Sequence, residues 1–368
     1  MIYFLGKYLH PHYEIFSLLR LVDYISARAI GAALTAIILT LALTPLVIRH
    51  LHRRGLVDQR RNTGVASAFD KAGTPAMGGA VVVGCVLVSC LLWCNMSNRF
   101  LLAVLAGMIW FGALGLADDI AKTRARSGDG GMSEARKLLL QAVFAAGLVI
   151  FLASPWTPLP AGQAGAFYVP FHKTPLFTSL WMYLPIVFFF VVAVGNAVNI
   201  TDGMDGLAIV PSVFAIGVLG LFGYFLGNAI WARYLNYPFY PGAGELAVFA
   251  SAFAGAGIGF LWFNAYPAQI FMGDTGSMAI GGSIAVLSVM LKQEVLFLIL
   301  GGLFVAEAAT SQIQDKIRIR WLGRRIFMRA PLHHAMQHKG LAETKVVIRL
   351  WIVSGILALA ALATLKLR

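Results

Sequence analysis

Charged residues are scarce in this sequence: only 12% of its 368 residues are Asp, Glu, Lys or Arg, about half of the share that is usual in a soluble domain. Hydrophobic residues make up 59% of the chain. This composition excludes a water-soluble globular protein, a disordered chain and a fibrous repeat. The bilayer is the solvent that the composition indicates, and we predict a polytopic, all-α integral membrane protein.

Cysteines and acidic residues are also few. The three cysteines, Cys85, Cys90 and Cys94, lie in one apolar stretch without the CxxC spacing, which indicates small packing residues and gives no sign of a metal site or a disulfide framework. The 29 Lys and Arg residues outnumber the 16 Asp and Glu residues, giving a formal net charge of +13. In a membrane protein, this excess fits anionic membrane lipids and a phosphorylated substrate better than it fits nucleic acid.

Long apolar runs recur along the whole chain, which we expect to form one transmembrane domain over residues 1–368. A membrane-spanning helix needs about 20 mostly apolar residues. The predicted spans, about ten in number, are 22–48, 76–94, 99–117, 138–153, 182–199, 206–226, 246–263, 277–290, 295–313 and 346–365. The outer segment 154–180 is rich in Pro and Gly and nearly uncharged, which indicates a small hairpin or loop cap.

The distribution of basic residues predicts the orientation. Ten spans place both termini on the same side of the membrane. The segments after the odd-numbered spans hold 19 of the 29 Lys and Arg residues, and the opposite side holds 8. Because basic loops stay in the cytoplasm, we expect both termini to be periplasmic and the basic loops to be cytoplasmic.

Acidic residues gather in three of the loops predicted to be cytoplasmic. They are Asp118 and Asp119 at the end of the third span, Asp202 and Asp205 between the fifth and sixth spans, and Asp274 before the eighth. Lys122 follows Asp118 by one helical turn. Ionisable groups at a membrane boundary are costly unless they are paired, hydrated or bound to a metal. These loops predict an active site at the cytoplasmic face.

Carboxylates beside Gly-rich turns are typical of phosphate and Mg²⁺ chemistry. Mg²⁺ is commonly held by one or two carboxylates together with substrate phosphates. Turns such as Gly203–Gly206 and Gly273–Gly276 allow backbone N–H groups to approach an anion. Lys122 and the basic loops could neutralise a diphosphate and a lipid phosphate.

Each of these residues also has an ordinary structural interpretation. Asp118 and Asp119 could form a solvated helix end, although a negative charge there opposes the helix dipole. Asp205 or Asp274 could cap the helix that follows it. His333 and His334 could be ordinary interfacial histidines, and Phe271 could simply pack in the core.

The motifs together resemble the polyprenyl-phosphate N-acetylhexosamine-1-phosphate transferases. They are Asp118-Asp119-x-x-Lys122, Asn199-x-x-Asp202-Gly-x-Asp205-Gly and Asn264-x-x-Pro267-Ala-x-x-Phe271-Met-Gly-Asp274-Thr-Gly-Ser277. Two further segments, Lys71-Ala-Gly-Thr-Pro-Ala-Met-Gly-Gly79 and Pro331-Leu-His-His334, are similar to the branch that transfers phospho-N-acetylmuramoyl-pentapeptide. The likeness extends from about residue 20 to Arg368.

This resemblance implies an activity and its partners. The expected reaction transfers phospho-MurNAc-pentapeptide from UDP-MurNAc-pentapeptide to undecaprenyl phosphate, requires Mg²⁺, and yields lipid I and UMP for peptidoglycan synthesis. The expected location is the inner membrane of a bacterium, and the expected assembly is a homodimer.

The resemblance also implies roles for individual residues. Asp274 would ligate Mg²⁺, Asp118 would act near the lipid phosphate as base or phosphate binder with Asp119 beside it, and Lys122 would hold phosphate. The residues implied on the nucleotide side are Asn199, Asp202, Asp205, Asn264 and Phe271, of which Phe271 is suited to stack on uracil. Lys71 and Lys137 would contact phosphate or uridine, and His333 and His334 would lie near the sugar–peptide moiety.

Two departures from the family pattern concern the histidine motif and the Thr-Pro motif. Ala335 and Gln337 stand where the family usually has a third histidine and an acidic residue, and Ala76 replaces a threonine. A sister transferase that moves another UDP-N-acetylhexosamine phosphate is the alternative from the same superfamily, and the patterns at 71–79 and 331–334 disfavour it. A transporter is the alternative from another class, but its ionisable residues should line a path at the membrane midplane.

Overall fold

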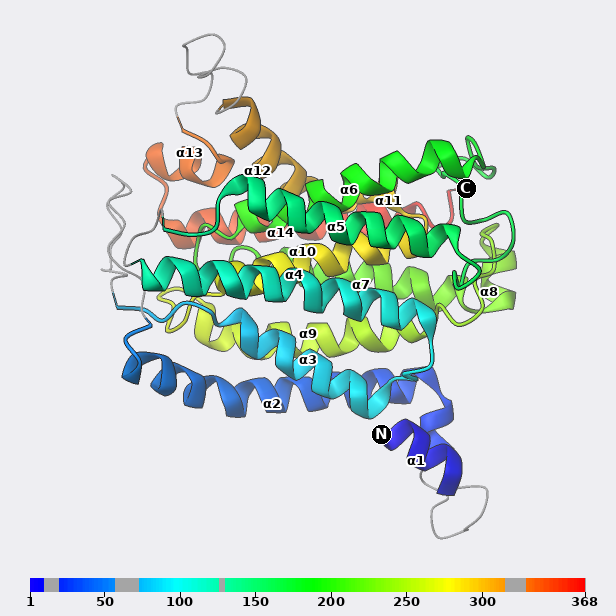
Figure 1. Ribbon diagram of the computed structural model, residues 1–368, viewed down its shortest axis with the longest axis horizontal. Coiled ribbons are helices and arrows are strands. Elements are labelled where there is room, and N and C mark those ends of the chain that lie inside the picture. The colour runs from blue at the N-terminus through cyan, green and yellow to red at the C-terminus, as the bar shows by residue number, and fades with distance from the viewer. Residues whose placement is uncertain (10–19, 57–72, 126–129, 315–328, 368) are drawn as a thin grey trace.

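The computed structural model describes residues 1–9, 20–56, 73–125, 130–314 and 329–367, and these residues form an all-helical bundle (Figure 1). The helices are α1 (Ile2–Leu9), α2 (Ile25–Arg53), α3 (Gly79–Trp93), α4 (Arg99–Arg124), α5 (Glu134–Ala153), α6 (Leu180–Thr201), α7 (Ile209–Leu226), α8 (Ala229–Tyr234), α9 (Glu245–Asn264), α10 (Gly273–Met290), α11 (Glu294–Leu300), α12 (Gly302–Gln312), α13 (Leu332–His338) and α14 (Glu343–Ala363).

Every predicted span coincides with helix, and seven helices are long and apolar enough to cross a membrane. These seven are α2, α4, α5, α6, α7, α9 and α14. The protein is therefore an all-α, multi-pass membrane protein. The prediction of about ten spans differs at three segments: α3 has only 15 residues, α10 falls outside the seven, and the segment 295–313 is broken into α11 and α12, which are bent by 86°.

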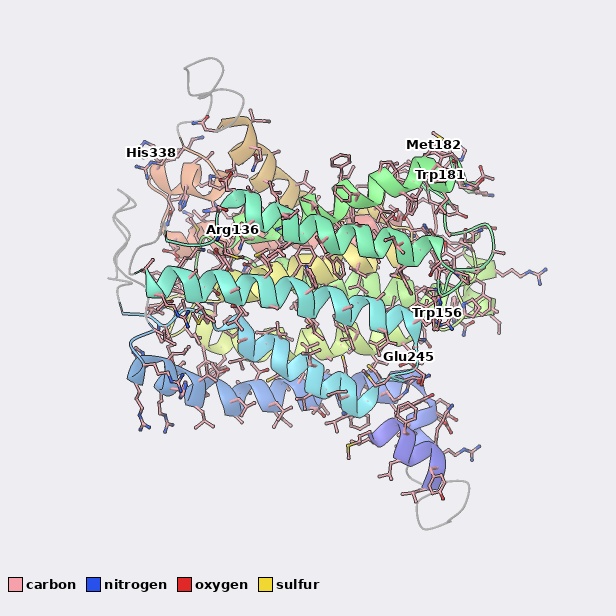
Figure 2. All side chains as sticks on the ribbon, viewed as in Figure 1. Arg136, Trp156, Trp181, Met182, Glu245 and His338 are labelled. Atoms are coloured by element: carbon pink, nitrogen blue, oxygen red, sulfur yellow. The ribbon has the colours of Figure 1, made fainter. Side chains whose placement is uncertain are left out.

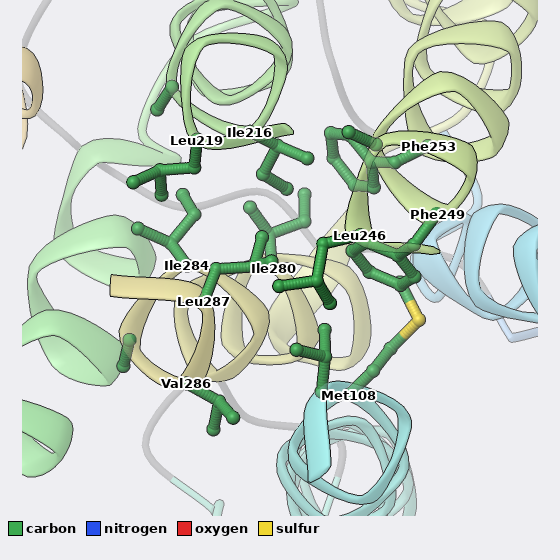
Figure 3. Packing of buried hydrophobic residues seen from close by; sticks show 14 of the residues in the cluster. Met108, Ile216, Leu219, Leu246, Phe249, Phe253, Ile280, Ile284, Val286 and Leu287 are labelled. Carbon is green, nitrogen blue, oxygen red and sulfur yellow. The ribbon is translucent and has the colours of Figure 1, made fainter. Parts of the chain in front are cut away.

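Helix α10 lies at the centre of the bundle, and every residue from Thr275 to Met290 is buried. Figure 3 shows Ile280 and Ile284 of α10 packing toward Ile216 of α7, and Met108 of α4 extending toward Phe249 of α9. A helix surrounded by other helices does not need a strongly apolar surface, which explains its Gly and Ser content.

Glycine lets the neighbours of α10 approach its backbone. A Cβ atom added to Gly115 of α4 would lie 2.1 Å from the carbonyl oxygen of Asp274. A Cβ atom on Gly79 of α3 would lie 2.1 Å from the Cα atom of Gly276. Both contacts occur at the N-terminal end of α10, so the start of this helix is fixed between α3 and α4.

The segment 154–180 lies at the opposite end of α10 and forms the predicted small hairpin. Phe167 and Phe177 make an antiparallel bridge, and their rings stack with centroids 5.2 Å apart. Lys292, just beyond the end of α10, donates to the carbonyl oxygen of Ala164 at 2.7 Å. Exposed Trp156 and Trp181 mark this end in Figure 2, opposite His338. Aromatic residues of this kind are typical of a membrane interface.

Candidate active site

Two aspartates and two lysines converge where α4, α5 and the start of α10 meet. Asp118 Oδ2 lies 2.6 Å from Lys137 Nζ and 2.8 Å from Lys122 Nζ. Asp274 Oδ2 lies 2.9 Å from Lys122 Nζ and 3.2 Å from Lys137 Nζ. Asp118 is fully buried, whereas the lysines and Asp274 keep some exposure. The buried Asp118 carboxylate therefore holds the ammonium groups of Lys122 and Lys137 side by side.

Asp118, Asp119 and Lys122 were expected to follow the third span, but α4 continues as helix to Arg124. The extension is possible because partners outside α4 satisfy the charges. Asp118 Oδ1 accepts from the backbone N–H of Met132 at 2.6 Å, in addition to its two lysine contacts. Charges paired in this way do not force the helix to end at the membrane boundary.

Asp119 faces away from the lysines and caps the N-terminus of α10. Its carboxylate accepts from the backbone N–H groups of Asp274, at 3.1 Å, and Thr275, at 2.9 Å, and from the Thr275 hydroxyl at 2.6 Å. A carboxylate at a helix N-terminus satisfies unpaired N–H groups and complements the dipole. Asp119, rather than Asp274, is therefore the cap of this helix, and it holds Asp274 in place.

The loop before α10 pairs through its backbone with the segment before α3. The N–H of Phe271 donates to the carbonyl oxygen of Pro75, and the N–H of Gly78 donates to the carbonyl oxygen of Phe271, both at 2.8 Å. The segment 73–79, singled out from the sequence, thus frames the loop that carries Phe271 and leads to Asp274. The Phe271 side chain remains partly exposed.

Asn264 and Asp205 hold the same loop from the other side. Asn264 accepts from the N–H of Gly206 at 3.0 Å and donates to the carbonyl oxygen of Ile270 at 2.9 Å. Asp205 Oδ2 accepts from the N–H of Ala268 at 3.1 Å. Asp205 does not cap the next helix, since α7 begins at Ile209 with no side-chain cap. Both residues have a framing role in this geometry.

Asn199 and Asp202 lie at the C-terminal end of α6. Asn199 Nδ2 donates to the Ser277 hydroxyl of α10 at 2.9 Å. Asp202 ends the helix, so Asp202 and Asp205 do not share a helical face. Burial and the negative charges of Asp274, Asp119 and Asp205 raise the pKa of Asp202 to about 8. Asp202 therefore belongs electrostatically to the carboxylate cluster, and a cation nearby would favour its ionised form.

His333 and His334 lie on α13, beside the turn that follows Asp202. Their ring centroids are 4.3 Å apart. A Cβ atom on Gly203 would lie 2.3 Å from His333 Nε2, so the ring packs directly against this turn. Burial and the adjacent His333 lower the pKa of His334. Lys71 falls outside the described residues, and its predicted role stays a prediction.

Sequence reasoning missed three polar residues near the site: Thr275, Glu307 and Glu343. Thr275 bonds to Asp119 and stands inside the motif that ends at Ser277, which was its signal. Glu343 accepts from the backbone N–H of Asp205, and nothing in the local sequence separates it from an ordinary polar residue. Glu307 contacts His333. It had a signal, because it is the only Asp, Glu, Lys or Arg within the predicted span 295–313.

A metal would find two carboxylates here rather than a complete protein cage. Among the described residues, no group of three or more His, Cys, Asp and Glu side chains is arranged to hold a metal. Asp118 and Asp274 nevertheless direct oxygens at the same two ammonium groups. Mg²⁺ is often bound by one or two carboxylates and completed by phosphates and water, so this donor set fits Mg²⁺ with a phosphorylated substrate.

One family comparison covers this region. The family described as Glycosyl transferase family 4 matches residues 101–292, slightly more than half of the chain. The match begins in α4 and ends just after α10, and it includes Asp118, Lys137, Asp202 and Asp274.

Proposed function

Because the chain belongs to glycosyl transferase family 4, the family of the polyprenyl-phosphate hexosamine-1-phosphate transferases, we propose that it transfers phospho-MurNAc-pentapeptide from UDP-MurNAc-pentapeptide to undecaprenyl phosphate. The products are lipid I and UMP. The observation that carries the proposal is the pair of lysines held between Asp118 and Asp274 at one end of the bundle.

The proposed reaction is a phosphoryl transfer. An oxygen of the lipid phosphate attacks the phosphorus attached to the sugar, and the bond from that phosphorus to the bridging oxygen of the diphosphate breaks. UMP leaves with that oxygen and its electron pair. Phosphoryl transfer requires little covalent work from the protein, so positioning and charge neutralisation supply most of the catalysis.

Lys122 and Lys137 provide that neutralisation in the proposed site. Each ammonium group lies 2.6–3.2 Å from an oxygen of both Asp118 and Asp274. Asp118, which also accepts from Met132 N–H, anchors the two lysines side by side. Phosphate oxygens could then reach the two lysines, because the side chains of Lys122 and Lys137 remain 24% and 22% exposed.

Mg²⁺ is proposed as the cofactor, with Asp274 as its ligand. When bound, the ion would neutralise charge on the diphosphate and on the developing UMP leaving group. Asp274 is suited to this role because Asp119 fixes the start of α10 from which it projects. The nucleotide would lie on the side of Asn199, Asp202 and Phe271, where the partly exposed Phe271 ring can stack on uracil.

The protein would act in the inner membrane of a bacterium, where a polyprenyl phosphate enters the site from the bilayer and the UDP-sugar enters from the cytoplasm. The homodimer expected from the resemblance remains part of this proposal. A transporter is disfavoured, since the carboxylates lie at the end of the bundle near the starts of α5 and α10 and not along a midplane path.

Purified protein should release UMP from UDP-MurNAc-pentapeptide in the presence of Mg²⁺ and undecaprenyl phosphate. Matched reactions with UDP-GlcNAc and UDP-GalNAc test whether the protein has the donor specificity of a sister transferase. Ala335 and Gln337, which depart from the histidine motif, are the reason for testing these donors. Release of UMP from one of those donors but not from UDP-MurNAc-pentapeptide would overturn the assignment while leaving the family chemistry intact.

A further inference from the structure

A buried glutamate on α12 holds the first residue of the histidine pair. Glu307 is 0% and His333 1% exposed. Glu307 Oε2 lies 3.0 Å from His333 Nδ1, and the backbone N–H of His333 donates to Glu307 Oε1 at 3.2 Å. One carboxylate therefore fixes both the ring and the backbone of His333.

The bent helix pair explains how Glu307 comes to be in this position. Helices α11 and α12 are separated only by Gly301 and are bent by 86°. A straight helix would continue in the direction of α11, whereas Figure 1 shows α12 turning toward α13. A single carboxylate in an otherwise uncharged apolar segment is costly unless it has a partner, and His333 is that partner.

The contact with the carboxylate favours hydrogen on the Nδ1 atom of His333. The Nδ1 atom faces Glu307 Oε2 at 3.0 Å, and a carboxylate oxygen in this position can accept the hydrogen of Nδ1. The other nitrogen, Nε2, is buried and has no hydrogen-bond partner among the described residues. A buried polar atom without a partner is unfavourable, which points to a partner that is present only in a complex.

Nε2 borders the candidate active site. It lies directly beneath the exposed Gly203, where an added Cβ atom would be 2.3 Å away. Gly203 directly follows Asp202, which ends α6. The other titratable groups facing the histidine pair are His334 itself and Arg329, whose charge acts on His334.

We propose that Glu307 is a positioning residue that keeps hydrogen on Nδ1 of His333 and so presents Nε2 as a hydrogen-bond acceptor for the sugar–peptide part of the UDP-sugar. This inference rests on the proposed function and adds to it a residue of α12 that determines donor specificity. Residue 203 must be small because a Cβ atom added there would clash with the His333 ring.

The test compares the binding of a complete donor with the binding of UMP, which lacks the sugar and peptide. Glu307→Leu should weaken binding of UDP-MurNAc-pentapeptide about tenfold, the effect of losing one hydrogen bond, and should leave UMP binding unchanged. Both affinities are measured by titration calorimetry on the purified full-length protein. The KM for the donor should rise while the KM for undecaprenyl phosphate stays the same.

Three further variants distinguish positioning from folding. In the His333→Ala background, Glu307→Leu should add no further loss, because the two residues act as a unit. Glu307→Gln keeps the side-chain shape and one acceptor oxygen, and should lose less donor affinity than Glu307→Leu; it replaces Glu307→Leu if that variant does not fold. Glu294 is a buried glutamate on α11. Glu294→Gln is the matched control and should change neither the affinity for UDP-MurNAc-pentapeptide nor the affinity for UMP.

Equal loss of donor and UMP binding, an unchanged donor affinity in a folded Glu307 variant, or additive effects in the double variant would overturn the inference. Absence of turnover in the wild-type protein would overturn the proposed function instead. In that case the donor-to-UMP binding ratio, measured with whichever UDP-sugar the wild type binds, still decides the role of Glu307.

Discussion

At the residue scale, the position of Asp274 depends on contacts made by its neighbours more than on contacts of its own. Asp119 accepts hydrogen bonds from the first N–H groups of α10, and Gly115 lets α4 approach the carbonyl oxygen of Asp274. The side chain of Asp274 is thereby directed to Lys122 and Lys137. This arrangement separates the residues that build the site from those that we expect to contact phosphate and metal.

Replacing Asp274 with Asn should abolish most turnover without unfolding the protein. The amide keeps the shape of the side chain but is a poorer ligand for a hard cation and a weaker partner for two ammonium groups. We expect a decrease in kcat of ~10²–10³-fold, measured as UMP release over a Mg²⁺ titration. Asp23→Asn, an exposed aspartate distant in sequence from the motifs, is the control. Near-normal turnover with the same Mg²⁺ dependence would contradict the assignment.

Asp118 and Phe271 should affect different substrates. Asp118→Asn removes the anchor of both lysines and should lower kcat while nucleotide binding persists. Phe271→Ala should weaken UMP binding by about 1–3 kcal/mol, the usual scale of base–aromatic stacking. The backbone bonds of Phe271 to Pro75 and Gly78 do not involve its side chain, so the loop should survive the substitution. Calorimetry beside turnover assays checks both, and the reverse pattern would show that the two substrates are placed wrongly.

At the scale of elements, the packing of α3 against α10 offers a matched pair of glycines. Gly79→Ala would put a Cβ atom 2.1 Å from the Cα atom of Gly276, whereas nothing lies within 4 Å of a Cβ atom on Gly84 in the same helix. We expect Gly79→Ala to lower both the Tm and the turnover, because α3 and α10 must separate where the site begins. Gly84→Ala should leave turnover intact and stabilise the protein by up to about 1 kcal/mol through helix propensity. Thermal unfolding in detergent, followed with activity, makes the comparison.

The positions of the helices were largely predictable from hydrophobicity, whereas their ends and bends were not. Each apolar run became helix because the bilayer leaves the backbone no other way to satisfy its hydrogen bonds. The extension of α4 to Arg124 depends on Lys137 and Met132 in the segments that follow it, and the bend at Gly301 separates α11 from α12. Such tertiary partners leave no periodic signal in the chain.

The sequence motifs predicted which residues gather at the candidate site, but they predicted only part of what each side chain does there. The motifs singled out Asp118, Lys122 and Asp274, and the fold brings these three residues together. Asp119 and Asn264 lie in the same motifs, yet Asp119 bonds to the start of α10, including the Thr275 hydroxyl, and Asn264 bonds to the backbone of the loop. A motif records that a residue matters, and only the geometry shows whether its side chain faces a ligand or a loop.

At the scale of the whole molecule, the two ends of the bundle carry different groups of polar residues. The aspartate–lysine cluster lies where α10 begins, and the hairpin of segment 154–180 is bonded to Lys292 where α10 ends. Figure 2 shows His338 at one end and Trp156 and Trp181 at the other. Which end faces the cytoplasm is a prediction from the basic loops alone.

Single-cysteine labelling tests that orientation with little background, because Cys85, Cys90 and Cys94 are all buried. A cysteine placed at Gln337 on α13 should resist a membrane-impermeant maleimide added to intact cells and should react once the membrane is opened. A cysteine placed at Ala161, exposed in the hairpin segment at the other end, should react in intact cells. The expected asymmetry follows from the 19 basic residues assigned to the α13 side against 8 on the other, since positively charged loops are retained in the cytoplasm. Labelling of Gln337→Cys but not of Ala161→Cys from outside would invert the topology, and it would place the aspartate–lysine cluster on the face that a cytoplasmic UDP-sugar cannot reach.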